Sequence, residues 1–431
     1  MAKVFKKINI LIVNIMVLVP LNVVAESIFS METIGERAPL TSPLSEFNYE
    51  SNSYPDPFPS DQIILTIDAE NYILYKETLL TPGQIKMFET YPKTFKMNIY
   101  PSRRSCAVPP EVLELTKKNA LLIDDGEGVQ GVVGSIPFPN PSEALHHVWN
   151  HILRYRGVEI YGASPFYIVN PDGTQTYGAG EAIAKNFWNP YVRNQDTGLQ
   201  GMLMTKVTNP PRLADASTLV IESLNAFKTP RKAWVYNPGT RRVRRAPDIS
   251  YDYMPSAAQG LTTVDQVDGF NGAKDRYHWL DLGDQLRLMP YNAYKFYETN
   301  IEEILTPYHV NQDFLRYELV KVNVVEAKLK DDKRHIIPKR IMYFDADSHN
   351  MLSEETYDDM NLIMAYREFP IINFYDQPMC LSIHSATYDF VTRRYQLQSV
   401  RSKDIPKVEW KLNEPHDIKM FTPEGLKRFA R

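Results

Sequence analysis

The sequence has no marked excess of either charge. In 431 residues, 48 lysines and arginines stand against 52 aspartates and glutamates, which gives a net charge of −4. A general nucleic-acid binder needs a broadly basic surface, so this balance argues against a nucleic-acid partner. After residue 25 the sequence also lacks any run of about 20 apolar residues, the length that spans a bilayer as a helix. We therefore expect the mature chain to be soluble.

Cysteine is scarce, with only Cys106 and Cys380 in the chain. In an oxidising compartment these two could form a disulfide. The alternative is two separate buried thiols, because the sequence does not show whether their Cα atoms approach closely enough to pair. Tyrosine, in contrast, is abundant at 26 residues. Many tyrosines are typical of extended strands and of surfaces lined by rings with a polar tip.

Residues 1–25 have the pattern of a secretory signal peptide. Three lysines precede an almost wholly apolar stretch, and Val23 and Ala25 occupy the −3 and −1 positions of a cleavage site. Cleavage after Ala25 would remove those three lysines and no acid, which leaves a mature net charge of −7. The alternative is an uncleaved membrane anchor, which the asparagines and the proline of the stretch disfavour. The residue directly after the cleavage site is not a cysteine, so a lipid-anchored lipoprotein is not expected. We predict an exported, periplasmic protein.

The remaining sequence divides by composition into three parts. Residues 26–60 are rich in Pro, Ser and Asn and predict an extended N-terminal arm with little core of its own. Residues 61–157 predict a helical and irregular part, and residues 158–431 predict antiparallel strands. We expect residues 61–431 to form one integrated domain.

Three helices are predicted in the first of these folded parts. The first covers Ala69–Leu80. The second has the body Gln84–Tyr91, and Thr81 caps it ahead of a proline at the first helical position. The third covers Pro141–Tyr155, with Asn140 as its N-cap.

After residue 158 the chain predicts strands separated by turns such as Pro171-Asp172-Gly173 and Pro238-Gly239. Because no helices alternate with these strands, we predict a mainly β (α+β) fold. Its large curved antiparallel sheet would form a half-barrel, with helices covering an apolar cavity. The predicted strands are Tyr161–Asn170, Thr174–Tyr177, Leu219–Leu224, Lys232–Asn237, Arg241–Arg245, Phe314–Lys328, Lys339–Asp345, Met351–Tyr357, Leu362–Phe369, Met379–Phe390 and Arg393–Val400.

Several short motifs resemble cofactor or metal sites but lack the necessary context. Residues 126–131 match G-x-G-x-x-G, yet prolines soon after them prevent the helix that a dinucleotide site needs. His147 and His151 have a zinc-binding spacing, but we expect them on a solvated helix face. Asp345 and the residues after it resemble the start of a calcium loop, without the glycine and glutamate of an EF-hand, and predict an acidic turn. We predict no metal site and no cofactor.

Catalytic motifs are equally sparse. The G-x-S-x-G pattern of serine hydrolases is absent. Asp265, Asp268 and Asp275 are clustered and could supply carboxylates for glycoside hydrolysis, but a solvated loop is the default interpretation. We assign no catalytic residues.

Six basic residues and no acid lie between Arg231 and Arg245. On a hairpin, side-chain alternation puts Arg242 and Arg244 on one face. One interpretation is a site for an anionic head group or a partner. The other is internal salt bridges to downstream aspartates, or an edge strand protected by its charge.

Aromatic residues are concentrated in the same third of the chain. Core packing is the default for them, and lining of an apolar ligand cavity is the alternative. Together with Arg242 and Arg244, the candidate ligand-binding residues are Trp234, Tyr236, Phe270, Tyr277, Trp279 and Tyr291.

Four stretches of the sequence carry a family resemblance from about Leu40 to the C-terminus. They resemble the proteobacterial family called domain of unknown function 1329, with Gly134-Ser135 where a glycine pair is expected. The stretches are Gly134–Pro139 with Glu143, Trp149–His151 and Arg154–Gly157; Arg241–Pro247; Asp268–Gly272 with Asp275–Tyr277, Trp279 and Pro290–Asn292; and Phe421–Leu426.

This resemblance implies a fold like the lipoprotein carriers LolA and LolB, a curved half-barrel closed by helices around an apolar cavity. It also implies partners in the envelope: an inner-membrane transporter of the resistance-nodulation-division class and an outer-membrane protein. It implies no catalytic residues. The carrier function is an analogy at the level of fold.

The leading hypothesis is a non-enzymatic periplasmic carrier or chaperone for a lipid or another hydrophobic molecule, serving an envelope transport system. A periplasmic hydrolase of a polysaccharide or ester is one alternative, and it predicts titratable groups converging in the cavity. A structural adaptor of an envelope complex is another, and it predicts an exposed apolar patch without an enclosed pocket.

Overall fold

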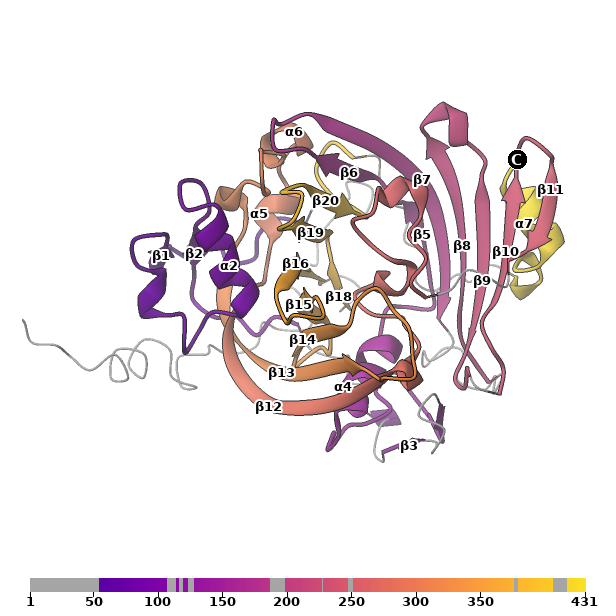
Figure 1. Ribbon diagram of the computed structural model, residues 1–431, viewed down its shortest axis with the longest axis horizontal. Helices are drawn as coiled ribbons and strands as arrows, with labels where there is room; N and C mark the ends of the chain where they lie inside the picture. Colours follow the sequence, from indigo (N-terminus) through magenta and orange to yellow (C-terminus); the bar gives the residue numbers. More distant parts are fainter. Residues whose placement is uncertain are drawn as a thin grey trace, which may run out of the picture.

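One 16-stranded sheet dominates the computed structural model (Figure 1). The structure describes residues 54–106, 114–115, 119–122, 128–186, 198–226, 228–246, 251–375, 379–405 and 417–431. The predicted signal peptide and most of the predicted arm lie outside these residues. Within them, no helix has the length and apolarity needed to cross a bilayer. The predicted mainly β fold with a large, open, antiparallel sheet is confirmed, and one parallel pairing, between β2 and β13, joins the N-terminal strands to it.

One half of the sheet, which we call the meander, continues through successive hairpins. The predicted strands Lys339–Asp345 and Met351–Tyr357 appear with these bounds, because well-placed turns separate them. The meander consists of β12 (Tyr277–Pro290), β13 (Tyr317–Leu329), β14 (Lys339–Asp345), β15 (Met351–Tyr357), β16 (Ile363–Glu368), β19 (Ser385–Asp389) and β20 (Tyr395–Gln398).

The other half, which we call the wall, continues from β20 through β6 to the sheet edge at β11. The turn at Pro171-Asp172-Gly173 and the hairpin at Pro238-Gly239 are both confirmed. The wall consists of β5 (Glu159–Ala163), β6 (Phe166–Val169), β7 (Gln175–Asn186), β8 (Leu199–Asn209), β9 (Ser217–Ser223), β10 (Lys232–Asn237) and β11 (Arg242–Arg245).

Both faces of β15, one of the central strands of the meander, are covered. Helix α2 (Pro82–Thr90) lies on one face, where its Gly83 N–H donates to Glu355 of β15 at 2.7 Å. Helix α4 (Ala144–Leu153) and residues 251–276, which we call the cover segment, lie on the other face. Arg367 of β16 donates to the carbonyls of Gln266 and Gly269 in that segment. Every residue of β15 is therefore buried.

The wall is covered on one face by helix α7 (Pro423–Phe429), which lies on its outer side in Figure 1. Phe421 and Leu426 pack there against Ile183, Met204 and Leu219. These three sheet residues are opposite one another in the register of β7, β8 and β9, so they share a face. The opposite, inner face of the wall points toward the cover segment.

The helix predictions have mixed outcomes. Thr81 forms the predicted capping box with Gln84, so α2 is confirmed. The predicted helix Ala69–Leu80 is wrong: only the short 3-10 helix η2 (Tyr72–Leu74) forms, since the Asn71 side chain accepts from the Asp68 N–H and competes with helical bonding.

Helix α4 begins at Ala144, three residues later than predicted. Asn140 does not cap it, because its backbone N–H and carbonyl are bonded to Asn119. Instead the Ser142 N–H donates to the His146 ring. The predicted N-cap was therefore assigned to a residue that a distant loop already holds.

Smaller elements complete the structure. The strand predicted over Met379–Phe390 divides into two, because β18 (Met379–Ser382) pairs with β17 (Ile371–Phe374) while β19 pairs with β20. Part of the glycine motif lies outside the described residues, and the rest contains β4 (Val129–Gln130), paired with β3 (Leu121–Leu122). The remaining short strands and α-helices are β1 (Leu65–Ile67), β2 (Met97–Ile99), α5 (Tyr294–Tyr297) and α6 (Ile301–Ile304).

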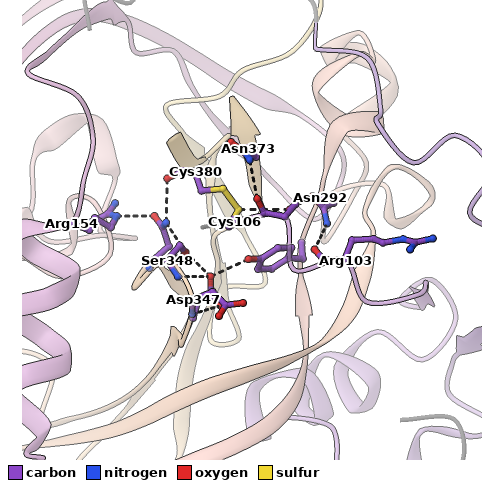
Figure 2. The surroundings of a disulfide bond; sticks show 12 residues. Arg103, Cys106, Arg154, Asn292, Asp347, Ser348, Asn373 and Cys380 are labelled. Atoms are coloured by element: carbon purple, nitrogen blue, oxygen red, sulfur yellow. Dashed lines mark hydrogen bonds between the residues drawn. A yellow bond between two sulfur atoms is a disulfide. The ribbon is translucent and has the colours of Figure 1, made fainter. Parts of the chain in front are cut away.

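Cys106 and Cys380 form a disulfide, which decides between the two alternatives left by the sequence (Figure 2). It joins the segment after β2 to β18, and their Cα atoms lie 5.6 Å apart. Amide side chains hold both sides: Asn373 donates to the Ser105 carbonyl at 2.8 Å and Asn350 to the Cys380 carbonyl at 3.2 Å. The crosslink therefore lies in a hydrogen-bonded region beside the meander.

Candidate functional site

The inner face of the wall carries small and apolar side chains. Cross-strand partners share a face, and the register from β7 to β10 defines two central rows on it. With the exception of Ala233, the side chains in these rows are half-buried, so this face is open where the outer face is closed. The rows consist of Ala182, Ala184, Leu203, Thr205, Thr218, Val220, Ala233 and Val235.

A cavity of about 190 Å³ lies where this inner face meets the cover segment. Ala184, Leu203 and Val220 line it from the sheet, and Val264 and Phe270 line it from the cover segment. An engineered cavity of about 150 Å³ can hold a benzene ring, whereas pockets for drug-sized ligands measure about 300–1,000 Å³. A cavity of this size suits a head group or a short chain, and a longer chain would continue along the inner face.

Polar residues fasten the cover segment to the wall at this cavity. Arg231 forms an ion pair with Glu222 at 2.5 Å and donates to the Asn271 carbonyl at 3.0 Å. The Asn271 side chain accepts from Gln200 at 3.0 Å and donates to Glu222 at 3.3 Å. Opening the cavity at this end would break these bonds together.

Asp268 closes the other side of the cavity. Its carboxylate accepts from Arg154 at 2.5 Å and also from Arg156. Burial alone would raise the pKa of Asp268, but the two guanidinium groups outweigh it and lower the pKa well below its ordinary value. Nearby, burial lowers the pKa of His151 to about 3, so its ring is neutral where it contacts the Asp268 carbonyl at 2.7 Å.

The cavity contains some of the groups that the hydrolase hypothesis requires. Charged groups do converge there, as the hydrolase hypothesis requires, so the cavity is not purely apolar. However, its two carboxylates, Glu222 and Asp268, are both ion-paired. Serine, threonine, cysteine, tyrosine and histidine do not occur among the described lining residues, so this cavity presents no side-chain nucleophile of these types.

Asp265 is not part of the solvated loop that was expected for the clustered aspartates, whereas Asp268 is exposed. Asp265 is fully buried and forms an ion pair with Arg340 at 2.5 Å. Burial would raise the pKa of Asp265, but Arg340 and His335 outweigh it and lower the pKa to about 2. Asp275 pairs with Lys333 at 3.1 Å nearer the surface. For Asp265 the prediction was wrong because its partners, Arg340 and His335, lie far along the chain.

His147 and His151 are also not on a solvated face, since both are buried. The prediction was wrong because α4 lies between the meander and the cover segment, so it is covered on more than its apolar side. Among the residues that the structure describes, no group of three or more potential ligands could hold a metal. Asp345 begins a turn between β14 and β15, as predicted, and accepts from the Ser348 N–H at 3.1 Å.

The candidate aromatic residues are distributed over three clusters. Trp234 and Tyr236 belong to the cluster under α7, on the outer face of the wall. Phe270 lines the cavity, and Tyr277 and Trp279 pack in the same cluster behind it. Tyr291 lies elsewhere, beside the disulfide, and donates to Asp345 at 3.0 Å. Ligand binding by these residues stays a prediction.

Arg242 and Arg244 are exposed on the edge strand β11. They lie on the inner face, opposite the face that carries Trp234 and Tyr236, since Arg244 is the cross-strand partner of Val235. The structure therefore does not bring these arginines together with those aromatic rings.

Sequence reasoning missed the charged residues of the cavity. Arg156 and Asn271 belonged to quoted family stretches and Arg231 began the basic run, but nothing in the sequence related them. Strand pairing and the fold-back of the cover segment bring these positions to one place. The two stretches that contain Arg154–Gly157 and Asp268–Gly272 meet through the Asp268 ion pairs.

The family described as "Protein of unknown function (DUF1329)" matches residues 66–427. The chain belongs to this DUF1329 family. It is also 37% identical over 382 residues to Uncharacterized protein PA3922 of Pseudomonas aeruginosa, a match that covers 86% of this chain and 83% of that protein. The predicted family resemblance is confirmed.

Solved structures similar to this DUF1329 chain share little sequence with it. A domain from Vibrio parahaemolyticus provisionally assigned to outer membrane lipoprotein sorting has a TM-score of 0.46 at 14% identity, covering 66% of this chain and 98% of that one. A DUF1329 family protein from Desulfovibrio piger has a TM-score of 0.41 at 12% identity, covering 60% and 88%. LolA superfamily protein NE2245 from Nitrosomonas europaea has a TM-score of 0.37 at 11% identity, covering 62% and 96%.

Proposed function

We propose that this protein is a carrier for a lipid or another hydrophobic molecule, and that the ligand lies on the inner face of the wall. The observation that supports this most is the contrast between the two faces of the wall. One face is closed by α7, while the other presents half-buried alanine, valine, leucine and threonine side chains that lead into a cavity. Each methylene buried there would contribute about 0.8 kcal/mol of binding free energy.

The proposal includes export to the periplasm. The signal-peptide pattern of residues 1–25 motivates it, and the Cys106–Cys380 disulfide supports it because such bonds persist in oxidising compartments. We expect the protein in the periplasmic fraction, with a mature N-terminus at Glu26. Intact mass measurement of that fraction tests this, and a full-length protein in the cytosol would contradict it.

Partners in the envelope are a further part of the proposal. The family resemblance suggests a resistance-nodulation-division transporter in the inner membrane and an outer-membrane protein. Crosslinking in intact cells followed by identification of the crosslinked proteins tests this, and we expect proteins of both membranes among the products.

Ligand binding is tested most directly by filling the cavity. Ala184→Trp places a large side chain in the cavity, whereas Thr208→Trp places one at an exposed position of the same sheet. We expect the first variant to bind a fluorescent fatty acid at least about tenfold more weakly than the natural protein, and the second to bind it equally well. Native mass spectrometry of the gently purified protein should also show a bound ligand. A protein that carries no ligand and binds no such probe would contradict the carrier function.

A further inference from the structure

We infer that the charged end of the cavity binds a singly charged anionic head group of the hydrophobic ligand, a carboxylate. This inference rests on the proposed carrier function and assigns a chemical class to its ligand. It places the head group at Arg231 and Arg156, within the cavity, and not at the exposed arginines of the hairpin.

Arg231 has unused hydrogen-bonding capacity inside the protein. Its side chain is only 8% exposed, and one of its nitrogens, Nη2, holds Glu222 and the Asn271 carbonyl. Its Nε and Nη1 are buried without an acceptor among the described residues. The guanidinium also lies 4.2 Å from the centre of the Tyr251 ring, which fixes its plane. Buried donors without a partner are costly, so an acceptor at this position would be bound favourably.

Arg156 contributes a second guanidinium to the same cavity. Its Nη1 donates to Asp268 and its Nη2 to the Ile152 carbonyl at 3.0 Å. Its Nε is buried and likewise has no acceptor among the described residues. Arg340 in the meander has an unpaired Nε as well, but it does not line this cavity. Unsatisfied donors on residues that line the cavity therefore distinguish Arg231 and Arg156.

The charge balance of the cavity favours a single negative charge. Arg156 and Arg231 balance the carboxylates of Glu222 and Asp268, and Arg154 adds a third cation at Asp268. Lys185 is on the outer face with Ile183 and is opposite Glu159 in the register, so this pair does not change the balance. One positive charge remains. A carboxylate neutralises it, whereas a phosphate monoester with a charge of about −1.5 to −2 would exceed it.

The position of the charge fits an amphipathic molecule. The apolar residues Leu203, Val220 and Phe270 line the same cavity as the two arginines, and Leu203 and Val220 continue into the open inner face. A carboxylate at Arg231 would place the first methylenes against these side chains. The guanidinium plane suits bidentate contact with a carboxylate.

The test compares two fluorescent probes, dansylamino-undecanoic acid and its methyl ester, with the full mature chain. We expect the natural protein to bind the acid about tenfold more tightly than the ester, because charge-assisted hydrogen bonds are the stronger ones. Competition by dodecanoate and by dodecyl phosphate compares the two anions, and we expect the carboxylate to displace the acid probe at lower concentration. A stronger displacement by dodecyl phosphate would overturn the assignment of a single charge.

Variants with opposite expected effects distinguish a binding role from a structural one. Arg231→Met should remove the preference for the acid while ester binding persists. Glu222→Gln should increase that preference, because it frees the Arg231 guanidinium from its partner. Arg156→Met should reduce the preference for the acid, and it tests the inference if Arg231→Met does not fold. Arg245→Met is the matched control, because Arg245 is on the outer face of the β10–β11 hairpin that follows Arg231. It should leave the preference for the acid unchanged.

The outcomes separate this inference from the carrier function. If the natural protein binds acid and ester equally well, the head-group inference is overturned and the carrier function stands. If it binds neither probe, the carrier function itself fails. If it prefers the acid and the preference survives both arginine substitutions, the charge is recognised elsewhere and the inference is again overturned.

Discussion

The meander and the wall belong to one sheet but are buried in different ways. In the meander, β15 is buried at every position because α2 lies on one face and the cover segment on the other. In the wall, only Met202 and Met204 of β8 are buried, because α7 covers the outer face and the cover segment meets the inner face only at the cavity. A strand enclosed on both faces has no surface left for a ligand. The wall keeps an open inner face, so it is the half in which we place the ligand.

Charged side chains are also paired differently in the two halves of the sheet. In the meander, Glu354 is shared between Arg340 at 3.1 Å and Arg367 at 2.5 Å, and all three side chains are fully buried. Buried charges persist only when they are paired. Such pairing stabilises the meander, whereas Arg156 and Arg231, which line the cavity beside the wall, retain donors without an acceptor among the described residues.

The largest expected loss of stability follows from breaking the buried ion pairs of the meander. Arg340→Met removes the main partner of Asp265 and leaves that carboxylate buried. We expect a loss of about 3–5 kcal/mol in the free energy of unfolding, measured by urea denaturation. Lys328→Met, at an exposed position of the neighbouring β13, should change it by less than about 0.5 kcal/mol. Equal effects of the two substitutions would show that the buried network is not what stabilises the meander.

The two faces of the wall should respond differently to the same substitution. Leu426 of α7 is fully buried against the outer face, so Leu426→Ala should cost about 3 kcal/mol of stability. Leu203 is half-buried on the inner face, so Leu203→Ala should cost less than about 1 kcal/mol and instead weaken ligand binding. Thermal denaturation and probe titration of both variants measure this. A large stability loss for Leu203→Ala would mean that the inner face belongs to the core.

The pH dependence of stability should have opposite signs at two carboxyl groups. Burial raises the pKa of Glu368 to about 7, although three tyrosine hydroxyls donate to it. A raised pKa stabilises the folded state below the ordinary value near 4.5, and this contribution is lost as the pH rises through about 7. The loss should reach about 2–3 kcal/mol. Asp268, with its lowered pKa, stabilises above its ordinary value and loses that contribution as the pH falls.

Glu368→Gln provides the check on this dependence. We expect its free energy of unfolding to change less between pH 5 and pH 8 than that of the natural protein, as measured by denaturation at a series of pH values. An unchanged slope would show that another group controls this pH range.

The smallest expected effect is at the edge of the wall. Arg242→Ser with Arg244→Ser should change the free energy of unfolding by less than about 0.5 kcal/mol, since both side chains are exposed. If their charge protects the edge strand, the double variant should associate at high protein concentration, which light scattering detects. A fully monomeric variant would contradict that interpretation of the basic run.

The sequence predicted local structure well and long-range contacts poorly. The hairpins of the meander and the strand Lys232–Asn237 could be predicted because turns and alternation are encoded within a few residues. The burial of His147 and the ion pairs of Asp268 could not be predicted, since each depends on segments more than 100 residues away. The cavity itself forms between strands and a cover segment whose meeting no local pattern predicts.

The disulfide has a consequence for the covalent topology of the chain. Cys106 and Cys380 are 274 residues apart, and the whole wall is part of the loop that they close. A protease that cuts the backbone once anywhere in that loop would leave both fragments on one molecule. Such a nicked protein would keep its full mass on a non-reducing gel and divide into two bands only after reduction. The backbone of the wall could thus be cut once while the wall stays covalently attached to the rest of the protein.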